Sequence, residues 1–462
     1  MDTSTSSSAD LPPSSAKTGF LKTCFNGVNV LSGIGLLSIP YAVSQGGWLS
    51  LAAFLAVAGV CCYTGLLLQR CMDASPLVRT YPDIGALAFG RAGRAAVAAL
   101  MYLELFLVAA GFLILEGDNL HRLFPAFTGF RVAGGLIRVG GRQGFVLAVL
   151  PTAWFADRLG ALAYLAAGGA LASVALVAAV LWVAVFGGVG FRETGRLVHW
   201  PGMPSAVSLY SFCFSGHAVF PAMYTGMKDK KRFPIVLFIC FAVSTVSYGF
   251  MGVIGYLMYG DSLESQVTLN LPSGSACSKI AIVTTLVNPL SKYALVLAPI
   301  AEALEAALGV AATSRRRRPL LLRVLVRTAL VAGTAVVALA VPFFADVVAL
   351  TGALLSCTAT MLLPCLCYLR VREKQAAGTS SEKAWLETAA CAAIVAGGGA
   401  VAGVGTYSSV TQIQHSGTKV PQLPRRTRFN VTSQARSPDS RTDRGVVPSS
   451  KDTCTAEAGP AL

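Results

Sequence analysis

The chain has 462 residues and a formal net charge of +15, yet only 13% of its residues are charged and 54% are hydrophobic. A soluble protein carries about 25% charged residues, so this composition excludes an ordinary soluble globular protein. The basic residues gather in short clusters between long uncharged stretches. That distribution argues against a nucleic-acid partner and favours membrane orientation. We therefore expect an all-α integral membrane protein in a lipid bilayer.

The two ends of the chain differ from its middle. Residues 1–16 are polar and rich in serine, without the basic start and apolar stretch of a secretory signal. The tail, 409–462, is basic and rich in Pro, Ser and Thr. Such compositions predict disorder, with a transmembrane domain over residues 17–408 between the two ends.

Eleven apolar segments approach the length of about 20 residues that a helix needs to cross a bilayer core. In chain order they are 20–43, 48–68, 95–115, 144–156, 161–186, 204–225, 234–258, 280–304, 320–341, 344–369 and 385–406. The fourth segment is the weakest, because it is short and ends at Asp157 and Arg158. The sixth contains His217 and several other polar residues.

The Lys and Arg residues of the connecting loops set the expected orientation. Most of them fall on the cytosolic side if the N-terminus is cytosolic, as the positive-inside rule requires. Without the fourth span the later basic clusters would lie on the wrong side, so the charge pattern supports that span. Eleven spans then place the C-terminus on the lumenal side. Only such a tail could use the N-glycosylation pattern at Asn430.

The first and sixth spans each contain a Ser-Gly pair in mid-span, followed by a proline. The two sets are Ser32-Gly33 with Pro40, and Ser215-Gly216 with Pro221. Glycine and proline both weaken a helix, so we expect both helices to be discontinuous. Unpaired backbone groups are tolerated in a membrane only where protein or a polar cavity satisfies them. Interrupted spans in corresponding positions of two halves indicate a transporter's binding site. Helix packing through small residues is the competing interpretation.

A free amino acid fits such a pair of breaks, because it carries one carboxylate and one ammonium group. Amides near Ser32–Gly35 offer the positive end of a helix dipole to the carboxylate. Carbonyls near Asn29–Leu31 and Phe214–Ser215 offer acceptors to the ammonium group. The predicted substrate-binding residues are Asn29, Ser32, Gly33, Ile34, Gly35, Phe214, Ser215, Gly216 and His217.

Two ionisable residues within the spans are candidates for proton coupling. Glu104 lies near the middle of the third span, where a charged side chain is costly and is by default a functional residue. Burial favours the protonated form of a carboxyl group, although Glu104 could instead make a structural hydrogen bond to a neighbouring helix. His217 follows the break in the sixth span, and histidine changes charge near neutral pH. The alternative for His217 is a cap on the broken helix.

Other polar residues give weaker signals. Thr284 and Asn288 in the eighth span are candidate ligands for an ion or the substrate, although such residues more often bond to their own helix. Glu302 and Glu305 share a helix face at the expected cytosolic end of that span, where solvated charge is the expected role. The sequence contains no clustered catalytic or metal-binding pattern. We expect neither an enzyme nor a metal site nor a cofactor.

The segment 25–42, FNGVNVLSGIGLLSIPYA, resembles the first span of the amino acid/auxin permease family. Segments 81–85, 112–120, 210–221 and 227–229 are similar to its plant vacuolar amino-acid transporter branch. The resemblance runs from about residue 18 to about residue 410. It implies eleven spans with a five-plus-five inverted repeat, like the bacterial leucine transporter. It also implies neutral amino acids as substrates, the proton rather than sodium as coupling ion, and residence in the vacuolar membrane.

The loop 131–143, rich in Gly and Arg, and the long tail after residue 414 depart from that family's pattern. Two other functions stay open: an amino-acid sensor, and a carrier of auxin-like organic acids. The plasma membrane is the alternative location. Symport or antiport, the direction of transport and the oligomeric state are left open by the sequence.

Overall fold

The computed structural model describes residues 18–33, 35–132, 137–141, 143–144, 146–147, 162–191, 193–272, 274–309, 317–341, 343–375 and 382–419. Two compact units meet in sequence at Lys419, and all the described elements lie in the first unit, Met1–Lys419. This unit is nearly all helical, as predicted. Besides an isolated parallel bridge between Thr18 and Met227, the β-structure among the described residues is an antiparallel strand pair at the Gly- and Arg-rich loop, formed by β1 (Gly129–Val132) and β2 (Ile137–Gly140).

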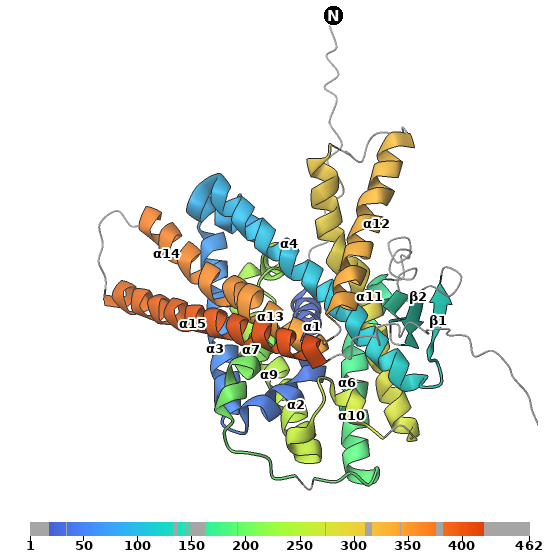
Figure 1. Ribbon diagram of the computed structural model, residues 1–462. Coiled ribbons are helices and arrows are strands. Elements are labelled where there is room, and N and C mark those ends of the chain that lie inside the picture. The colour runs from blue at the N-terminus through green and yellow to red at the C-terminus, as the bar shows by residue number, and fades with distance from the viewer. Residues whose placement is uncertain are drawn as a thin grey trace, which may run out of the picture. The chain divides into compact units, whose positions relative to one another are not determined.

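Helices lie at the predicted spans in chain order, apart from the fourth span, most of which the structure does not describe (Figure 1). They are α1 (Phe20–Leu31), α2 (Gly35–Gly46), α3 (Ser50–Asp73), α4 (Tyr81–Leu123), α6 (Leu162–Phe186), α7 (Met203–Cys213), α8 (Phe220–Gly226), α9 (Phe233–Tyr259), α10 (Val267–Asn270), α11 (Ala276–Ala307), α12 (Arg317–Ala340), α13 (Phe344–Leu350), α14 (Leu363–Gln375) and α15 (Glu382–Lys419). Short turns of other helix types are η2 (Trp200–Gly202), η3 (Lys230–Arg232), η4 (Gly260–Ser262), η5 (Thr351–Ser356) and η6 (Thr358–Leu362).

The described residues contain 6 helices long and apolar enough to cross a membrane, or 7 if α1 and α2 count as one bent span. The fourth predicted span, 144–156, lies mostly outside the described residues. The expected number of eleven spans therefore stays a prediction. The predicted terminal segment 1–16 and residues 420–462 lie outside the described residues too, while α15 continues to Lys419, past the expected start of the tail at 409.

Both predicted helix breaks are present. The first separates α1 from α2, whose axes differ in direction by 49°. The second separates α7, which ends at Cys213, from α8, which begins at Phe220. The helices α2 and α7 pack against each other, and both α1 and α2 pack against α9. The two broken spans are thus neighbours in the core of the unit.

Glycines at the breaks allow this close packing. A Cβ atom added to Gly35 would lie 2.6 Å from Sγ of Cys213 and 3.2 Å from its Cα atom. A Cβ atom on Gly216 would lie 2.9 Å from the side chain of Leu31. A larger residue at Gly35 would press against the backbone of Cys213 and push the two spans apart, whereas at Gly216 the side chain of Leu31 would have to shift.

The helix α4 extends well beyond the predicted span 95–115. A capping box starts it, because Thr80 N donates to Asp83 Oδ2 at 3.0 Å and the Thr80 hydroxyl accepts from Asp83 N. Gly90, with φ 72° and ψ −152°, then interrupts the helical backbone before the span. The rest of α4 packs against α11 and α12 and carries Glu104 into the core.

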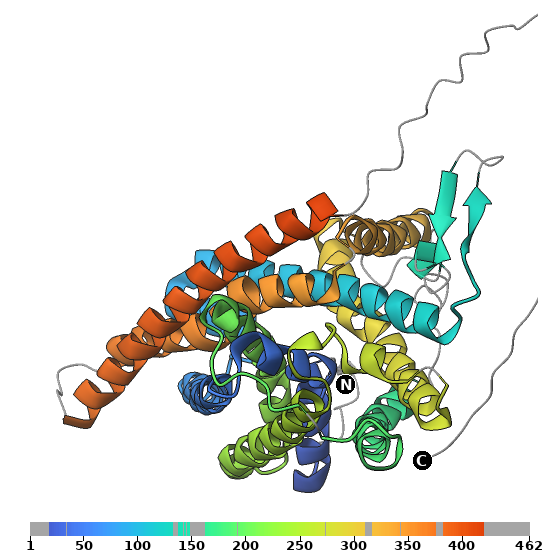
Figure 2. The same ribbon diagram turned by 60° about the horizontal axis from the view of Figure 1, so that its bottom comes forward.

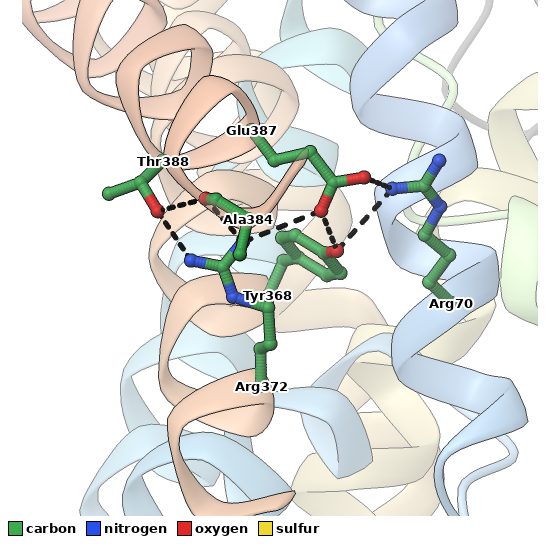
Figure 3. A network of polar contacts seen from close by, with 6 residues as sticks. All are labelled: Arg70, Tyr368, Arg372, Ala384, Glu387 and Thr388. Carbon is green, nitrogen blue, oxygen red and sulfur yellow. Dashed lines mark hydrogen bonds and ion pairs between the residues drawn. The ribbon is translucent and has the colours of Figure 1, made fainter. Parts of the chain in front are cut away.

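The end of α3 is tied to α14 and α15 by a network of polar side chains (Figure 3). Glu387 of α15 accepts hydrogen bonds from Arg70 Nη1 at 2.8 Å and from the Tyr368 hydroxyl at 2.6 Å. Arg372 Nη1 lies 3.4 Å from the same carboxylate. Figure 2 shows α15, in red, running alongside α14, in orange. In the expected orientation, this network lies on the cytosolic side.

Candidate functional site

A cavity of about 190 Å³ lies where the two broken spans meet. Its walls come from α1, α2, α4, α7, α9, α11 and the segment between α7 and α8. Most of the lining is apolar and includes Val30, Leu105, Val108, Phe112, Val219 and Val296. Four side chains bring polar groups to it: Glu104, Ser215, Tyr248 and Lys292. An apolar chamber with a few convergent polar groups is the usual form of a small-molecule site.

Glu104 connects three spans at this cavity. Its Oε1 atom accepts hydrogen bonds from the Ser215 hydroxyl at 2.8 Å and from the Ser356 hydroxyl at 2.6 Å. Ser215 belongs to the second break, and Ser356 ends the π-helical turn η5. The Glu104 side chain is buried. The buried carboxylate thus holds α4, the sixth span and the tenth span together.

Tyr248 of α9 forms hydrogen bonds with the main chain at the first break. Its hydroxyl donates to the main-chain oxygen of Leu31 and accepts from the Gly33 amide at 3.4 Å. One side chain thereby adds a hydrogen-bond partner to a carbonyl and an amide of the break, which also bond to each other, Gly33 N donating to Leu31 O at 2.9 Å. Such pairing is what a broken helix needs away from water.

Lys292 of α11 is a charged residue at the cavity that the sequence analysis did not select. Its Nζ atom donates to the main-chain oxygen of Asn29 at 3.0 Å and lies 3.5 Å from that of Ser32. The signal was present, because Lys292 lies inside the predicted span 280–304, and an ionisable residue within a span is a functional candidate by default.

Only some of the predicted site residues line the cavity. Gly33, Gly35, Ser215, Gly216 and Glu104 line the cavity. Asn29 and Ser32 contribute main-chain oxygens to Lys292. Ile34 lies outside the described residues.

Neither Phe214 nor His217 lines this cavity. The Phe214 ring packs between Phe54 and Tyr248, with centroid distances of 5.2 and 5.8 Å. His217 Nε2 lies 3.1 Å from the Cys61 carbonyl oxygen and 2.9 Å from the Thr64 hydroxyl, both on α3. Because a carbonyl oxygen only accepts, we assign the ring proton to Nε2. These contacts fit a structural role for His217, which connects the second break to α3, better than a contact with substrate.

The remaining candidates are on α11. The Thr284 hydroxyl donates to Ile280 O at 2.7 Å, a bond within its own helix. The same residue lines a second cavity of only about 20 Å³, together with Gly33 and Pro289. The side chain of Asn288 lies outside the described residues. Glu305 is buried, with Oε1 3.1 Å from Arg327 Nε and Oε2 3.5 Å from Arg323 Nε, so the expected solvated role is wrong for it, while Glu302 is exposed.

Comparison with known proteins decides the family. Residues 16–411 match the family described as transmembrane amino acid transporter protein. This chain belongs to that family. It is a transporter-family protein and not an enzyme, and it is a multi-pass membrane protein. No group of three or more His, Cys, Asp or Glu side chains that could hold a metal ion occurs in the part of this transporter that the structure describes.

Individual relatives agree with this assignment. The transporter is 47% identical to amino acid transporter AVT1I of Arabidopsis thaliana over 76% of this chain and 86% of that protein. It is 44% identical to amino acid transporter AVT1J of the same plant, over 86% of this chain and 92% of that protein. Among solved structures, MhsT in complex with L-phenylalanine matches with a TM-score of 0.50 and 14% identity, over 86% of this chain and 98% of that one. This likeness shows a fold like that of the bacterial leucine transporter.

Proposed function

We propose that this transporter carries neutral amino acids across the vacuolar membrane by alternating access around its two breaks, with the proton as coupling ion. The observation that carries the proposal is the cavity at the meeting point of both breaks, with Glu104 in its wall. Its relatives AVT1I and AVT1J bear the name of amino acid transporters, which supports the substrate class. MhsT was crystallised with an amino acid.

The cavity wall supports neutral substrates. Its side chains are mostly apolar and suit an uncharged amino-acid side chain. The Gly35 amide remains a proposed partner of the substrate carboxylate, whereas the Gly33 amide already donates to Leu31 O at 2.9 Å. The substrate's ammonium group is better placed at the second break than at the first, because Lys292 already donates to the Asn29 carbonyl. Its proposed partners are Glu104 and the carbonyls near Phe214–Ser215.

Glu104 suits a coupling role because its charge and its contacts change together. As a carboxylate it accepts from both Ser215 and Ser356. Protonation removes the negative charge that strengthens both hydrogen bonds, and a proton placed on Oε1 would also force one of the two hydroxyls to turn away. Protonation would then weaken the hydrogen bonds that connect α4 to the sixth and tenth spans. His217 remains a second coupling candidate, acting through α3 rather than through direct contact with substrate.

Uptake into liposomes tests the proposal. Purified protein in sodium-free buffer is given a panel of labelled neutral, acidic and basic amino acids, with and without an imposed pH gradient. We expect accumulation of neutral amino acids that requires the gradient and is absent from protein-free liposomes. Binding of an amino acid without any uptake would overturn transport in favour of sensing. Equal uptake with and without the pH gradient would show that the proton is not the coupling ion.

A further inference from the structure

The first break contains two main-chain oxygens that have lost their helical partners. In an uninterrupted helix, Asn29 O would accept from the Gly33 amide and Ser32 O from the Leu36 amide. Instead, Gly33 N donates to Leu31 O at 2.9 Å and Leu36 N donates to Gly33 O at 3.3 Å. Carbonyl groups at the end of a helix also carry the negative end of its dipole. The end of α1 is therefore a site that attracts a cation.

Lys292 supplies that cation from the chain itself. Its ammonium nitrogen is 3.0 Å from Asn29 O and 3.5 Å from Ser32 O, and the side chain reaches them across the cavity wall from α11. In transporters with broken helices, unwound carbonyls and the C-terminal ends of half-helices are the groups that coordinate a coupling cation. A lysine ammonium and a sodium ion carry the same charge and use the same oxygen partners.

We propose that Lys292 is a tethered cation, a positioning residue that fills the place at the end of α1 where a free sodium ion would otherwise bind. This proposal adds to the proposed transport function. Its consequence, that the carrier needs no sodium, rests on that function. The ammonium group of Lys292 stays covalently attached to α11, whereas a free ion would bind and leave with each cycle. Removing the side chain would leave two carbonyls facing a space that a small cation can enter.

Thermal unfolding in sodium or choline chloride tests the cation site without any need for transport. A ligand that binds only the native state raises its midpoint temperature. We expect the midpoint of the wild type to be the same in both salts. We expect the midpoint of Lys292→Ala to be lower in choline and to rise by at least about 2 °C in sodium. Lys292→Arg, which keeps a cation, is expected to lack the sodium response. Lys279→Ala, which removes an exposed lysine of the same helix, should behave as the wild type.

Amino-acid exchange across liposomes, with no ion gradient, gives the second readout. We expect wild-type exchange to change less than twofold between the two salts, and Lys292→Ala to be several-fold faster in sodium than in choline. A wild type stabilised by sodium would overturn the tethered cation, as would a folded Lys292→Ala variant with no sodium response in either assay. A wild type that exchanges no amino acid would count against the transport function alone, because the thermal assay still reports on the cation site.

Discussion

The Ser215 hydroxyl lies 2.8 Å from Oε1 of Glu104 and joins the break in the sixth span to the middle of α4. Ser356 donates to the same oxygen from the tenth span. One carboxylate oxygen therefore fixes two spans to a third at the wall of the central cavity. A change in the charge of Glu104 would therefore change the strength of both hydrogen bonds at once.

Glu104→Gln should abolish proton coupling while keeping the transporter folded. The amide oxygen of glutamine can still accept from the two serines, but the side chain can no longer take up a proton. We expect loss of uptake driven by a pH gradient, with gradient-free exchange of substrate retained. Glu302→Gln, an exposed carboxylate on α11, is the matched control and should leave both activities unchanged. Full gradient-driven uptake by Glu104→Gln would remove Glu104 from the coupling mechanism.

Ser356→Ala should lower the stability of the transporter measurably. A hydrogen bond to a charged group contributes about 1.5–3 kcal/mol, and the Ser356 side chain is buried. Thermal unfolding should show a lower midpoint, and the loss should be smaller in a Glu104→Gln background because the two residues are coupled. The control is Ser409→Ala, since the buried Ser409 hydroxyl has no hydrogen-bond partner among the described residues. Equal losses in both backgrounds would indicate that Ser356 acts independently of Glu104.

Gly35→Val should separate the two broken spans. Even the Cβ atom would lie 3.2 Å from the main-chain Cα of Cys213, which cannot rotate away as a side chain can. We expect reduced yield of folded protein and no exchange activity in whatever remains. Gly59 of α3 is the control, because a Cβ atom there would meet nothing within 4 Å. Normal exchange by Gly35→Val would show that the spans need not approach so closely.

The sequence was sufficient to locate both helix breaks, because Ser-Gly pairs and prolines interrupt a helix through local backbone chemistry. It was also sufficient to select Glu104, since a carboxylate in an apolar span is unusual wherever the span packs. The partners of Glu104 could not be predicted: Ser356 lies 252 residues away along the chain and meets Glu104 only through tertiary packing. His217 shows the same limit, because a non-helical stretch has no fixed face and its direction toward α3 depends on Thr64 and Cys61.

Lys292 was missed for a different reason. Lysines in the loops indicate the orientation of a membrane protein, whereas Lys292 lies inside a span. Its role depends on which helix end it reaches, and that is set by the packing of α11 beside the first break.

Tyr248→Phe tests how the first break is stabilised. The change removes the hydroxyl that pairs Leu31 O and Gly33 N while keeping the ring against Phe214. The Leu31 carbonyl and the Gly33 amide keep their bond to each other, so the variant loses the net contribution of the hydroxyl's hydrogen bonds, about 0.5–1.5 kcal/mol each; the thermal midpoint should fall and exchange should slow. Tyr407→Phe, which alters an exposed tyrosine of α15, should change neither. An unchanged midpoint for Tyr248→Phe would mean that the break satisfies its backbone by other means.

Glu387→Ala should weaken the junction of α3, α14 and α15 only modestly, and the loss should depend on salt (Figure 3). Arg70 and Glu387 have side-chain exposures of 46% and 32%, and exposed ion pairs contribute about 0–1 kcal/mol each. We expect a small fall in the thermal midpoint at low salt, and a smaller one at high salt because ions screen such pairs. Glu373→Ala is the control, since Glu373 is 67% exposed and pairs with Arg370 of its own helix. If Glu373→Ala lowered the midpoint as much as Glu387→Ala, general surface charge rather than this junction would explain the effect.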